Sequence, residues 1–268
     1  MKIVAWIRGI WNRLFGLFGR KCRSGSCGAA VVCVGMEHSR AYGACPGARV
    51  DLTGMAALLK KFTSDTDIQG PATFLDAQAT RQSVARALEE ALEADFCIFY
   101  YSGHGGQGRD PKGENGVSEF LCLDDGPLPD YKIWEMLQKA KGRVFMIFDC
   151  CHSATMFRSA EQADSAEHTE PFANTGFTFQ MLRTAWARPR AQGARGVENL
   201  LVWSGCPAND YSYGDATGGV LTNGIRNNFR CGISYDDLWM KAERAASSQN
   251  PVRTRIGAPE AFSGEAFR

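Results

Sequence analysis

The chain has 268 residues, 44% of them hydrophobic, and a formal net charge of +1. This length fits one decorated α/β domain or two small domains, and the near-neutral charge gives no reason to expect a nucleic acid or a generally acidic partner. Ten cysteines in a chain this long, several of them inside apolar runs, argue against a disulfide scaffold and favour a reducing, cytoplasmic setting.

The first twenty residues form a segment of their own. Apolar residues recur at helical spacing from Ile3 to Phe18, with Arg8 and Arg13 mostly opposite them, which predicts a basic amphipathic helix. The segment is too short and too charged to span a bilayer, and it lacks the continuous apolar region of a signal peptide. Three interpretations stay open: contact with an anionic membrane surface, packing on its own domain or a partner, or an expendable prosegment.

Farther along the chain, apolar runs alternate with segments of helical periodicity. In chain order, we expect a strand at 29–35, a helix at 51–62, a strand at 72–75, a helix at 80–92, strands at 96–101 and 120–123, a helix at 131–140, strands at 144–148 and 199–203, helices at 219–229 and 235–247, and a last short strand at 252–256. The weakly periodic stretch 155–198 is expected to be a long, partly mobile loop. This alternation predicts an α/β fold with a mostly parallel sheet and helices on both faces.

Two of the expected strands end in polar motifs. The first is followed by SGHGG at 102–106, and the second by DCCHS at 149–153. Sites in open α/β sheets form at the carboxyl ends of strands, so we expect His104 and Cys151 on the same sheet edge. A thiol attacks a peptide carbonyl as the thiolate and needs a base, and a histidine about 50 residues upstream of the cysteine is the caspase-type spacing.

These motifs resemble those of the caspase-like cysteine peptidases, and more closely the metacaspases and their bacterial relatives, the orthocaspases, than animal caspases. The sequence DCCHSA at 149–154 is similar to the metacaspase motif Asp-x-Cys-His-Ser-Gly, with Ala154 in place of the glycine. The resemblance runs from about residue 29 to 251. It implies a caspase-like three-layer sandwich, protein or peptide substrates and a monomer. It also divides the chain into an N-terminal helix and linker (1–28), a large-subunit-like part (29–158), an arginine-containing intersubunit-like loop (159–198), and a small-subunit-like part with a C-terminal tail (199–268).

The resemblance also assigns catalytic roles. Cys151 is the nucleophile, His104 is the base and acid, and the backbone N–H groups of Gly105 and Cys151 form the oxyanion hole. Cys150 is expected to pack under the sheet, because neighbours on a strand point to opposite faces, and His152 is taken as a loop residue. Taken singly, His104 could be a structural loop histidine and Cys151 a buried strand-end cysteine; the two motifs at this spacing favour the peptidase.

The expected specificity is for basic residues. Asp149 stands two residues before the nucleophile, where animal caspases have Gln, and Asp51 aligns with a pocket acid of metacaspases. Two carboxylates in one pocket favour Arg or Lys before the cut. Ser204 resembles a family residue that lines the pocket. Asp51 could instead cap a helix, and the neighbouring Arg49 could disturb the pocket. Self-cleavage is expected at arginines of the 155–198 loop.

The chemistry itself needs no cofactor, but many metacaspases need calcium. Asp124, Asp125 and Asp130 resemble parts of the family's carboxylate cluster, and calcium is bound by several oxygen ligands. However, Arg158 falls about where a further family aspartate would be, and DDGP at 124–127 is also a favourable turn sequence. Both interpretations stay open.

Two functional alternatives remain from the sequence. The chain could be a non-proteolytic caspase-fold scaffold or adaptor that acts through its N-terminal helix, or a peptidase of the same clan with another specificity, such as for asparagine. Inactive relatives usually lack the histidine or the cysteine. Because both His104 and Cys151 are present, the sequence favours a cysteine endopeptidase.

Overall fold

The computed structural model describes most of the expected domain. The predicted helix at 1–20, most of the 159–198 loop and the residues from Cys151 to Arg158 lie outside the described part. The structure describes residues 28–63, 69–114, 116–150, 197–206 and 212–267.

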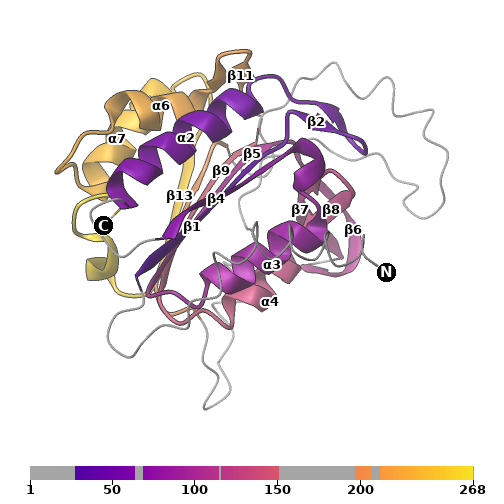
Figure 1. Cartoon of the computed structure of the whole chain (residues 1–268), viewed down its shortest axis with the longest axis horizontal. Coiled ribbons are helices and arrows are strands. Elements are labelled where there is room, and N and C mark those ends of the chain that lie inside the picture. Colours follow the sequence, from indigo (N-terminus) through magenta and orange to yellow (C-terminus); the bar gives the residue numbers. More distant parts are fainter. Residues whose placement is uncertain (1–27, 64–68, 115, 151–196, 207–211, 268) are drawn as a thin grey trace, which may run out of the picture.

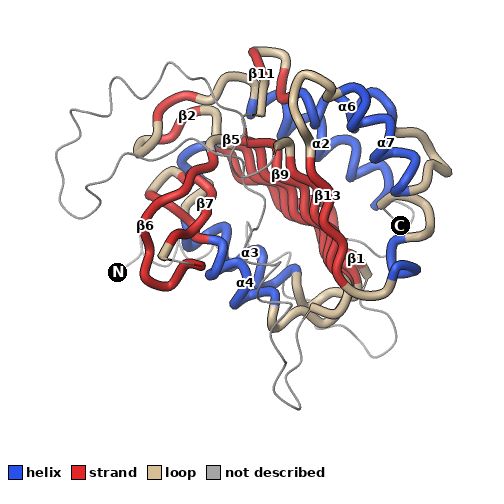
Figure 2. Tube along the Cα trace, turned by 180° about the vertical axis from the view of Figure 1, so that it is seen from behind, coloured by secondary structure: helices blue, strands red, loops and turns tan. Residues whose placement is uncertain are grey.

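A six-stranded sheet forms the centre of the molecule, in the order β13-β10-β9-β5-β1-β4 (Figures 1 and 2). Neighbouring strands are parallel except at the β10–β13 edge, which is antiparallel. The central strands are almost continuously apolar because helices cover both of their faces. The strands are β1 (Ala29–Gly35), β4 (Gln69–Leu75), β5 (Phe96–Gly103), β9 (Arg143–Cys150), β10 (Leu200–Ser204) and β13 (Val252–Ile256).

Helices α3 and α4 cover one face of this sheet, and α2, α6 and α7 cover the other (Figure 1). Strand alternation separates two apolar cores: Phe99 and Met146 pack on the first side, while Tyr100 and Phe145 pack on the second. The mostly parallel three-layer α/β sandwich is therefore confirmed. The helices are α2 (Ala48–Thr63), α3 (Arg81–Ala91), α4 (Asp130–Leu137), α6 (Val220–Asn228) and α7 (Tyr235–Ala245), with 3-10 turns at Asp76–Gln78 and Pro259–Phe262.

The glycine-rich stretch after His104 forms a strand, which the sequence did not predict. β6 (Gly105–Glu114), β7 (Val117–Leu123) and β8 (Gly126–Pro129) make a separate antiparallel sheet beyond the end of β5 (Figure 2). The β6 sequence lacks the apolar alternation by which strands are recognised. Gly106 lies against an aromatic ring, because a Cβ there would be 2.7 Å from the Phe120 ring.

Two small hairpins complete the described fold. Between the expected strand at 29–35 and the expected helix at 51–62, β2 (His38–Ser39) pairs with β3 (Gly43–Ala44). The second hairpin joins β11 (Gly214–Asp215) to β12 (Gly218–Gly219), directly before α6. Strands of two residues carry no hydrophobic period, so a sequence pattern cannot reveal them. None of the described helices combines the length and the apolar character needed to cross a membrane.

Candidate active site

The two polar motifs leave the central sheet side by side. β5 and β9 are parallel neighbours, and Gly103 lies opposite Cys150 at their carboxyl ends. The next residue in each chain segment is His104 on one side and Cys151 on the other, but Cys151 lies outside the described residues. The register thus brings the two motifs to one sheet edge, while the His104–Cys151 pair itself stays a prediction.

The imidazole of His104 is buried and oriented by the β2–β3 hairpin. Its Nε2 lies 2.9 Å from the carbonyl oxygen of Ala44, and only 7% of the residue is exposed. A carbonyl oxygen can only accept, so Nε2 carries the proton and Nδ1 is the basic nitrogen of the neutral ring. The backbone is held as well: the carbonyl oxygen of His104 accepts from the hydroxyl of Tyr101 at 2.6 Å and from the N–H of Cys122 at 3.0 Å.

The neighbours of the two motif residues have separate roles. Cys150 is 2% exposed and packs in the apolar core on the α3–α4 side of the sheet, as strand alternation predicted. Gly105, one of the two expected oxyanion donors, directly follows His104 and begins β6. The other expected donor, the N–H of Cys151, lies outside the described residues, and so does His152.

Asp51 is fully buried, and its carboxylate points out of its own helix. α2 begins at Ala48, so Asp51 lies inside the first turn, and the alternative role as N-cap is wrong. Its Oδ2 accepts from the hydroxyl of Ser102 at 2.8 Å and from the N–H of Gly219 at 2.9 Å. Ser102 is the residue before Gly103 on β5, so this carboxylate lies beside the strand that leads to His104.

Asp149 is also fully buried, and its carboxylate faces the start of α6. Oδ2 accepts from the backbone N–H of Thr222 at 2.7 Å, and Oδ1 accepts from the hydroxyl of Ser212 at 3.0 Å. Thr222 lies in the first turn of α6, where unpaired N–H groups and the helix dipole favour a negative charge. Its hydroxyl also lies 2.8 Å from the hydroxyl of Tyr100, which ties α6 to β5.

The charges of the two carboxylates act on each other, and neither carboxylate forms an ion pair with a described basic side chain. Burial, and secondly the charge of Asp149, raise the pKa of Asp51 to about 7, although Arg226 opposes this shift. Burial likewise raises the pKa of Asp149. Within the described part of the chain, neither carboxylate forms an ion pair, and Oδ1 of Asp51 has no hydrogen-bond partner. Arg49 does not enter the pocket: it pairs with Asp76, its Nη2 lying 2.8 Å from Oδ2.

Two glycines allow the backbone to approach these carboxylates closely. A Cβ on Gly218 would be 2.2 Å from Oδ1 of Asp51, and a Cβ on Gly219 would be 2.3 Å from Oδ2 of Asp149. Gly218 also has a φ of +117°, which side-chain-bearing residues rarely adopt. No local sequence pattern indicates this contact, because Gly219 is 168 positions from Asp51 along the chain.

Strand alternation places Ser204 on the α3–α4 side of the sheet with Phe148, and it is the neighbouring Gly205 that approaches Asp149. Ser204 is buried and ends β10 opposite Phe148. A Cβ on the next residue, Gly205, would be 3.0 Å from Oδ1 of Asp149. The carbonyl oxygen of Gly205 accepts from the Gln249 amide at 2.8 Å, so the residue that follows β10 is bonded to the segment before β13.

The three aspartates expected to bind calcium do not gather in the described residues. Oδ2 of Asp124 accepts from Nε of Arg40 at 2.7 Å, and Asp125 accepts from the backbone N–H of Arg81 at 2.7 Å. Asp130 is buried elsewhere, where desolvation and the charge of Glu119 raise its pKa to about 7. No group of three His, Cys, Asp or Glu among the described residues could hold a metal ion. These contacts do not fit the expected ligand cluster.

A separate groove of about 1020 Å³ lies among α3, α4 and the β6–β8 sheet. Phe120 and Met136 are among the residues that line it, whereas His104, Asp51 and Asp149 are not. The groove therefore does not belong to the candidate site.

Known proteins with similar sequences are metacaspases. Metacaspase-1B of Neurospora crassa is 35% identical over 92 residues, which are 30% of this chain and 22% of that protein. Metacaspase-1 of Candida glabrata is 33% identical over 89 residues, which are 28% of this chain and 23% of that protein. The match thus spans less than a quarter of either relative's length.

Solved structures with the same fold cover nearly the whole chain. The protein GSU0716 of Geobacter sulfurreducens has a TM-score of 0.63 at 24% identity and covers 90% of this chain and 98% of its own. Caspase-1 of Spodoptera frugiperda has a TM-score of 0.53 at 11% identity and covers 92% and 96%. At these identities the likeness concerns the fold alone. The family model of the caspase domain matches residues 28–260, so this chain belongs to the caspase domain family and is related to the metacaspases.

Proposed function

We propose that this chain is a cysteine endopeptidase of metacaspase type that cuts after Arg or Lys. The observation that carries the proposal is the buried pair of Asp51 and Asp149, which lies beside the strand ends that lead to His104 and Cys151 and has no basic partner among the described residues. Membership of the caspase domain family supports a peptidase. The negative charge of the Asp51–Asp149 pair supports Arg or Lys as the residue before the cut.

A basic substrate side chain would complete the pocket. Two buried carboxylates repel each other, and each is costly to ionise without a counter-charge. A guanidinium brings one positive charge and several N–H donors, which suit the unpartnered Oδ1 of Asp51. A lysine ammonium brings the charge but a less extended set of donors, so we expect Arg to be preferred over Lys. An acidic side chain would add a further negative charge and be excluded.

The proposed reaction follows from the tautomer of His104. Nδ1 takes the proton of the Cys151 thiol, and the thiolate attacks the carbonyl carbon of the peptide bond. A C–S bond forms, and the oxyanion is bound by the N–H groups of Gly105 and Cys151. The C–N bond then breaks as the imidazolium returns its proton to the leaving amine. Water, with His104 again as base, hydrolyses the thioester and restores the thiol.

A panel of short fluorogenic peptides that differ only in the residue before the cut tests this function. We expect cleavage after Arg, weaker cleavage after Lys, and about 100-fold less or none after Asp or Asn. Cys151→Ala and His104→Ala should each remove the activity. Cleavage after Asp or Asn but not Arg would overturn the pocket assignment. No cleavage of any peptide by the intact chain would favour a non-proteolytic scaffold.

Self-processing is a second part of the proposal. The 155–198 stretch contains several arginines, such as Arg158 and Arg183, that fit the proposed specificity. We expect the purified chain to convert into two fragments over time, with a basic residue at the new carboxyl terminus. The Cys151→Ala protein should stay whole. Fragments formed equally by Cys151→Ala in clean buffer would refute self-cleavage.

A further inference from the structure

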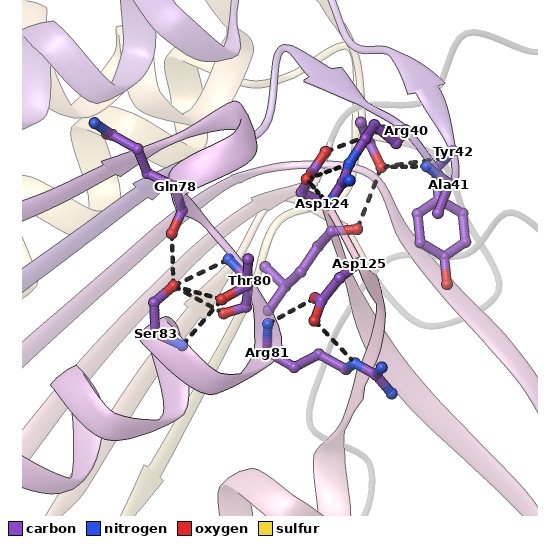
Figure 3. Close-up of polar contacts among 11 residues, drawn as sticks. Arg40, Ala41, Tyr42, Gln78, Thr80, Arg81, Ser83, Asp124 and Asp125 are labelled. Atoms are coloured by element: carbon purple, nitrogen blue, oxygen red, sulfur yellow. Dashed lines mark hydrogen bonds and ion pairs between the residues drawn. The ribbon is translucent and has the colours of Figure 1, made fainter. Parts of the chain in front are cut away.

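An ion pair fixes the position of the β2–β3 hairpin. The side chain of Asp124 is 1% exposed and accepts two hydrogen bonds from Arg40, at Oδ1 from the backbone N–H at 3.1 Å and at Oδ2 from Nε at 2.7 Å (Figure 3). Nη2 of Arg40 also lies 2.6 Å from Oδ2 as an ion pair. These bonds to Arg40 hold the pKa of Asp124 below its usual value. The carboxylate is therefore ionised at neutral pH and already has a cationic partner from its own chain.

A second contact next to the ion pair ties the hairpin to the same place. The hydroxyl of Ser39 donates to the carbonyl oxygen of Leu123 at 3.2 Å, and it accepts from the N–H groups of Ala41 and Tyr42 at 3.1 Å each. Figure 3 shows these bonds beside the Asp124 carboxylate. The turn between β2 and β3 is thus attached through Ser39 and Arg40 to the end of β7.

The attached hairpin carries the oxygen that orients the catalytic imidazole. Ala44 is the last residue of β3, and its carbonyl oxygen is the partner of Nε2 of His104. The end of β7 also holds the backbone of His104, because the N–H of Cys122 donates to the His104 carbonyl oxygen. The segment from Cys122 to Asp124 therefore holds the backbone of His104 directly, through the N–H of Cys122. It holds the ring indirectly, because the Asp124–Arg40 pair positions the hairpin whose Ala44 carbonyl oxygen contacts Nε2.

The neighbouring aspartate offers an internal comparison. Asp125 accepts from the backbone N–H of Arg81 at 2.7 Å, and its Oδ2 lies 3.6 Å from Nε of Arg81. Arg81 begins α3, and its hydrogen bond and ion pair are with Asp125, while its charge also opposes the rise in the pKa of Tyr42 in the turn of the hairpin. The side chains of Arg40 and Arg81 are 73% and 54% exposed, so both are accessible surface arginines. They differ in their position and partner: Arg40 lies in the β2–β3 hairpin and pairs with Asp124, whereas Arg81 begins α3 and pairs with Asp125.

We infer that Arg40 is a positioning residue for His104 and takes the place that a divalent cation would need at Asp124. The guanidinium neutralises the carboxylate and orders the hairpin, and the hairpin presents the Ala44 carbonyl oxygen to Nε2. Calcium needs several oxygen ligands around one ion, whereas the Asp124 carboxylate is already engaged by two hydrogen bonds and the ion pair with Arg40. This inference rests on the proposed peptidase function, because it concerns the base of that reaction.

The test compares Arg40→Ala with Arg81→Ala as a matched control. A small displacement of a catalytic group lowers the rate more than it lowers binding, so Arg40→Ala should reduce kcat about 10- to 100-fold with KM nearly unchanged. Arg40→Lys should restore part of this loss, because it returns the charge without the paired donors. Arg81→Ala should change kcat by less than about 2-fold. Activity of the unmodified chain should be the same in chelator and in millimolar calcium.

A signal from the imidazole separates this inference from the proposed function. The chain has four histidines, so NMR of labelled histidine in the Cys151→Ala protein can follow His104, assigned through its loss in His104→Gln. Arg40→Ala should shift the His104 ring signals, and Arg81→Ala should not. This readout needs no substrate. If no peptide is cut, the proposed function fails while the positioning of His104 is still measured.

Three results would overturn the inference. The first is an unmodified chain that needs calcium for activity. The second is an Arg40→Ala protein with unchanged kcat and unchanged His104 signals. The third is an equal loss from Arg40→Ala and Arg81→Ala, which would indicate a general weakening of this region. Thermal unfolding identifies a variant that fails to fold. In that case Arg40→Lys decides, since full retention of kcat and of the His104 signals would contradict a role for the paired donors.

Discussion

Two pairs of aspartates in this chain have opposite surroundings. Asp51 and Asp149 are fully buried and have no basic partner in the described structure, and their pKa values are raised, chiefly by burial. Asp124 and Asp125 each contact an arginine, and the bonds to Arg40 lower the pKa of Asp124. A carboxylate whose counter-charge comes from the same chain serves the structure. A carboxylate pair whose counter-charge is missing is suited to bind a cation from outside.

The largest expected effect comes from neutralising the unpartnered pair. Asp149→Asn or Asp51→Asn should lower kcat/KM for Arg peptides about 100- to 1000-fold, because a buried ion pair that loses one partner costs about 3–5 kcal/mol. Asp125→Asn, which removes an arginine-paired carboxylate, should lower it less than about 3-fold. Steady-state kinetics on one peptide compares all three. Equal losses at the two pairs would remove the distinction between them.

Substrate binding should depend on pH through the same pair. Since the pKa of Asp51 is raised to about 7, its carboxyl becomes neutral as the pH falls below that value. The Kd of an Arg peptide for the Cys151→Ala protein should therefore rise about 10-fold per pH unit below 7 and level off above it. Calorimetry from pH 5 to pH 8.5 measures this, and Asp51→Asn should flatten the curve. A Kd that is constant with pH in the unmodified pocket would contradict the assignment.

The sequence predicted where the motif residues lie in the fold better than it predicted their surroundings. Apolar strands that end in polar motifs were sufficient to place His104 after the end of β5, whereas the family resemblance selected Asp51 and Asp149, whose roles stay predictions. The partners that set their chemistry were not predicted. Gly219 is 168 positions from Asp51, and Thr222 is 73 positions from Asp149. Such contacts depend on how α6 packs against the sheet, which no local pattern contains.

The hairpin that orients His104 was missed for a different reason. β2 and β3 have two residues each, too few for a hydrophobic period, and the turn between them looks like an ordinary loop. Arg40 is largely exposed and carries no motif, so nothing in the sequence linked it to Asp124. The expectation of calcium ligands at Asp124 and Asp125 came from family resemblance. The arginines opposite them emerge only when distant segments are brought together.

A smaller effect is expected from adding a methyl group at Gly219, which lies against the Asp149 carboxylate. A Cβ on Gly219 would be 2.3 Å from Oδ2 of Asp149, whereas a Cβ on Gly264 would meet no atom within 4 Å. Gly219→Ala should lower kcat/KM for Arg peptides about 10-fold by displacing the carboxylate, and Gly264→Ala should leave it unchanged. Kinetic constants of the two variants give the comparison. Full activity of Gly219→Ala would show that the pocket tolerates the added methyl group.

The smallest expected effect is on stability, and its sign differs between the pairs. Folding raises the pKa of Asp51 from 3.8 to about 7, so its protonated form favours the fold and that contribution is lost as the pH rises. Asp51→Asn should therefore raise the Tm relative to the unmodified chain, by an amount that grows from about pH 4 to pH 7 and is constant above. Folding lowers the pKa of Asp124, so Asp124→Asn should lower the Tm at neutral pH, with the difference vanishing as the pH falls below about 4.

Calorimetric unfolding of both variants across this range tests the signs together. Both experiments use the Cys151→Ala background to prevent self-cleavage during heating. A lower Tm for Asp51→Asn at pH 8 would mean that the ionised carboxylate is already compensated in the unliganded chain. That result would contradict the account of Asp51 and Asp149 without affecting the account of Asp124.

The most direct measurement is the affinity of the Cys151→Ala protein for two peptides that differ only in Arg or citrulline before the scissile bond. Citrulline keeps the shape of arginine but carries no charge. We expect the Arg peptide to bind about 100-fold more tightly at pH 8, and Asp51→Asn to remove most of that difference. Equal affinities for the two peptides in the unmodified pocket would contradict the claim that the buried aspartate pair binds a cationic side chain.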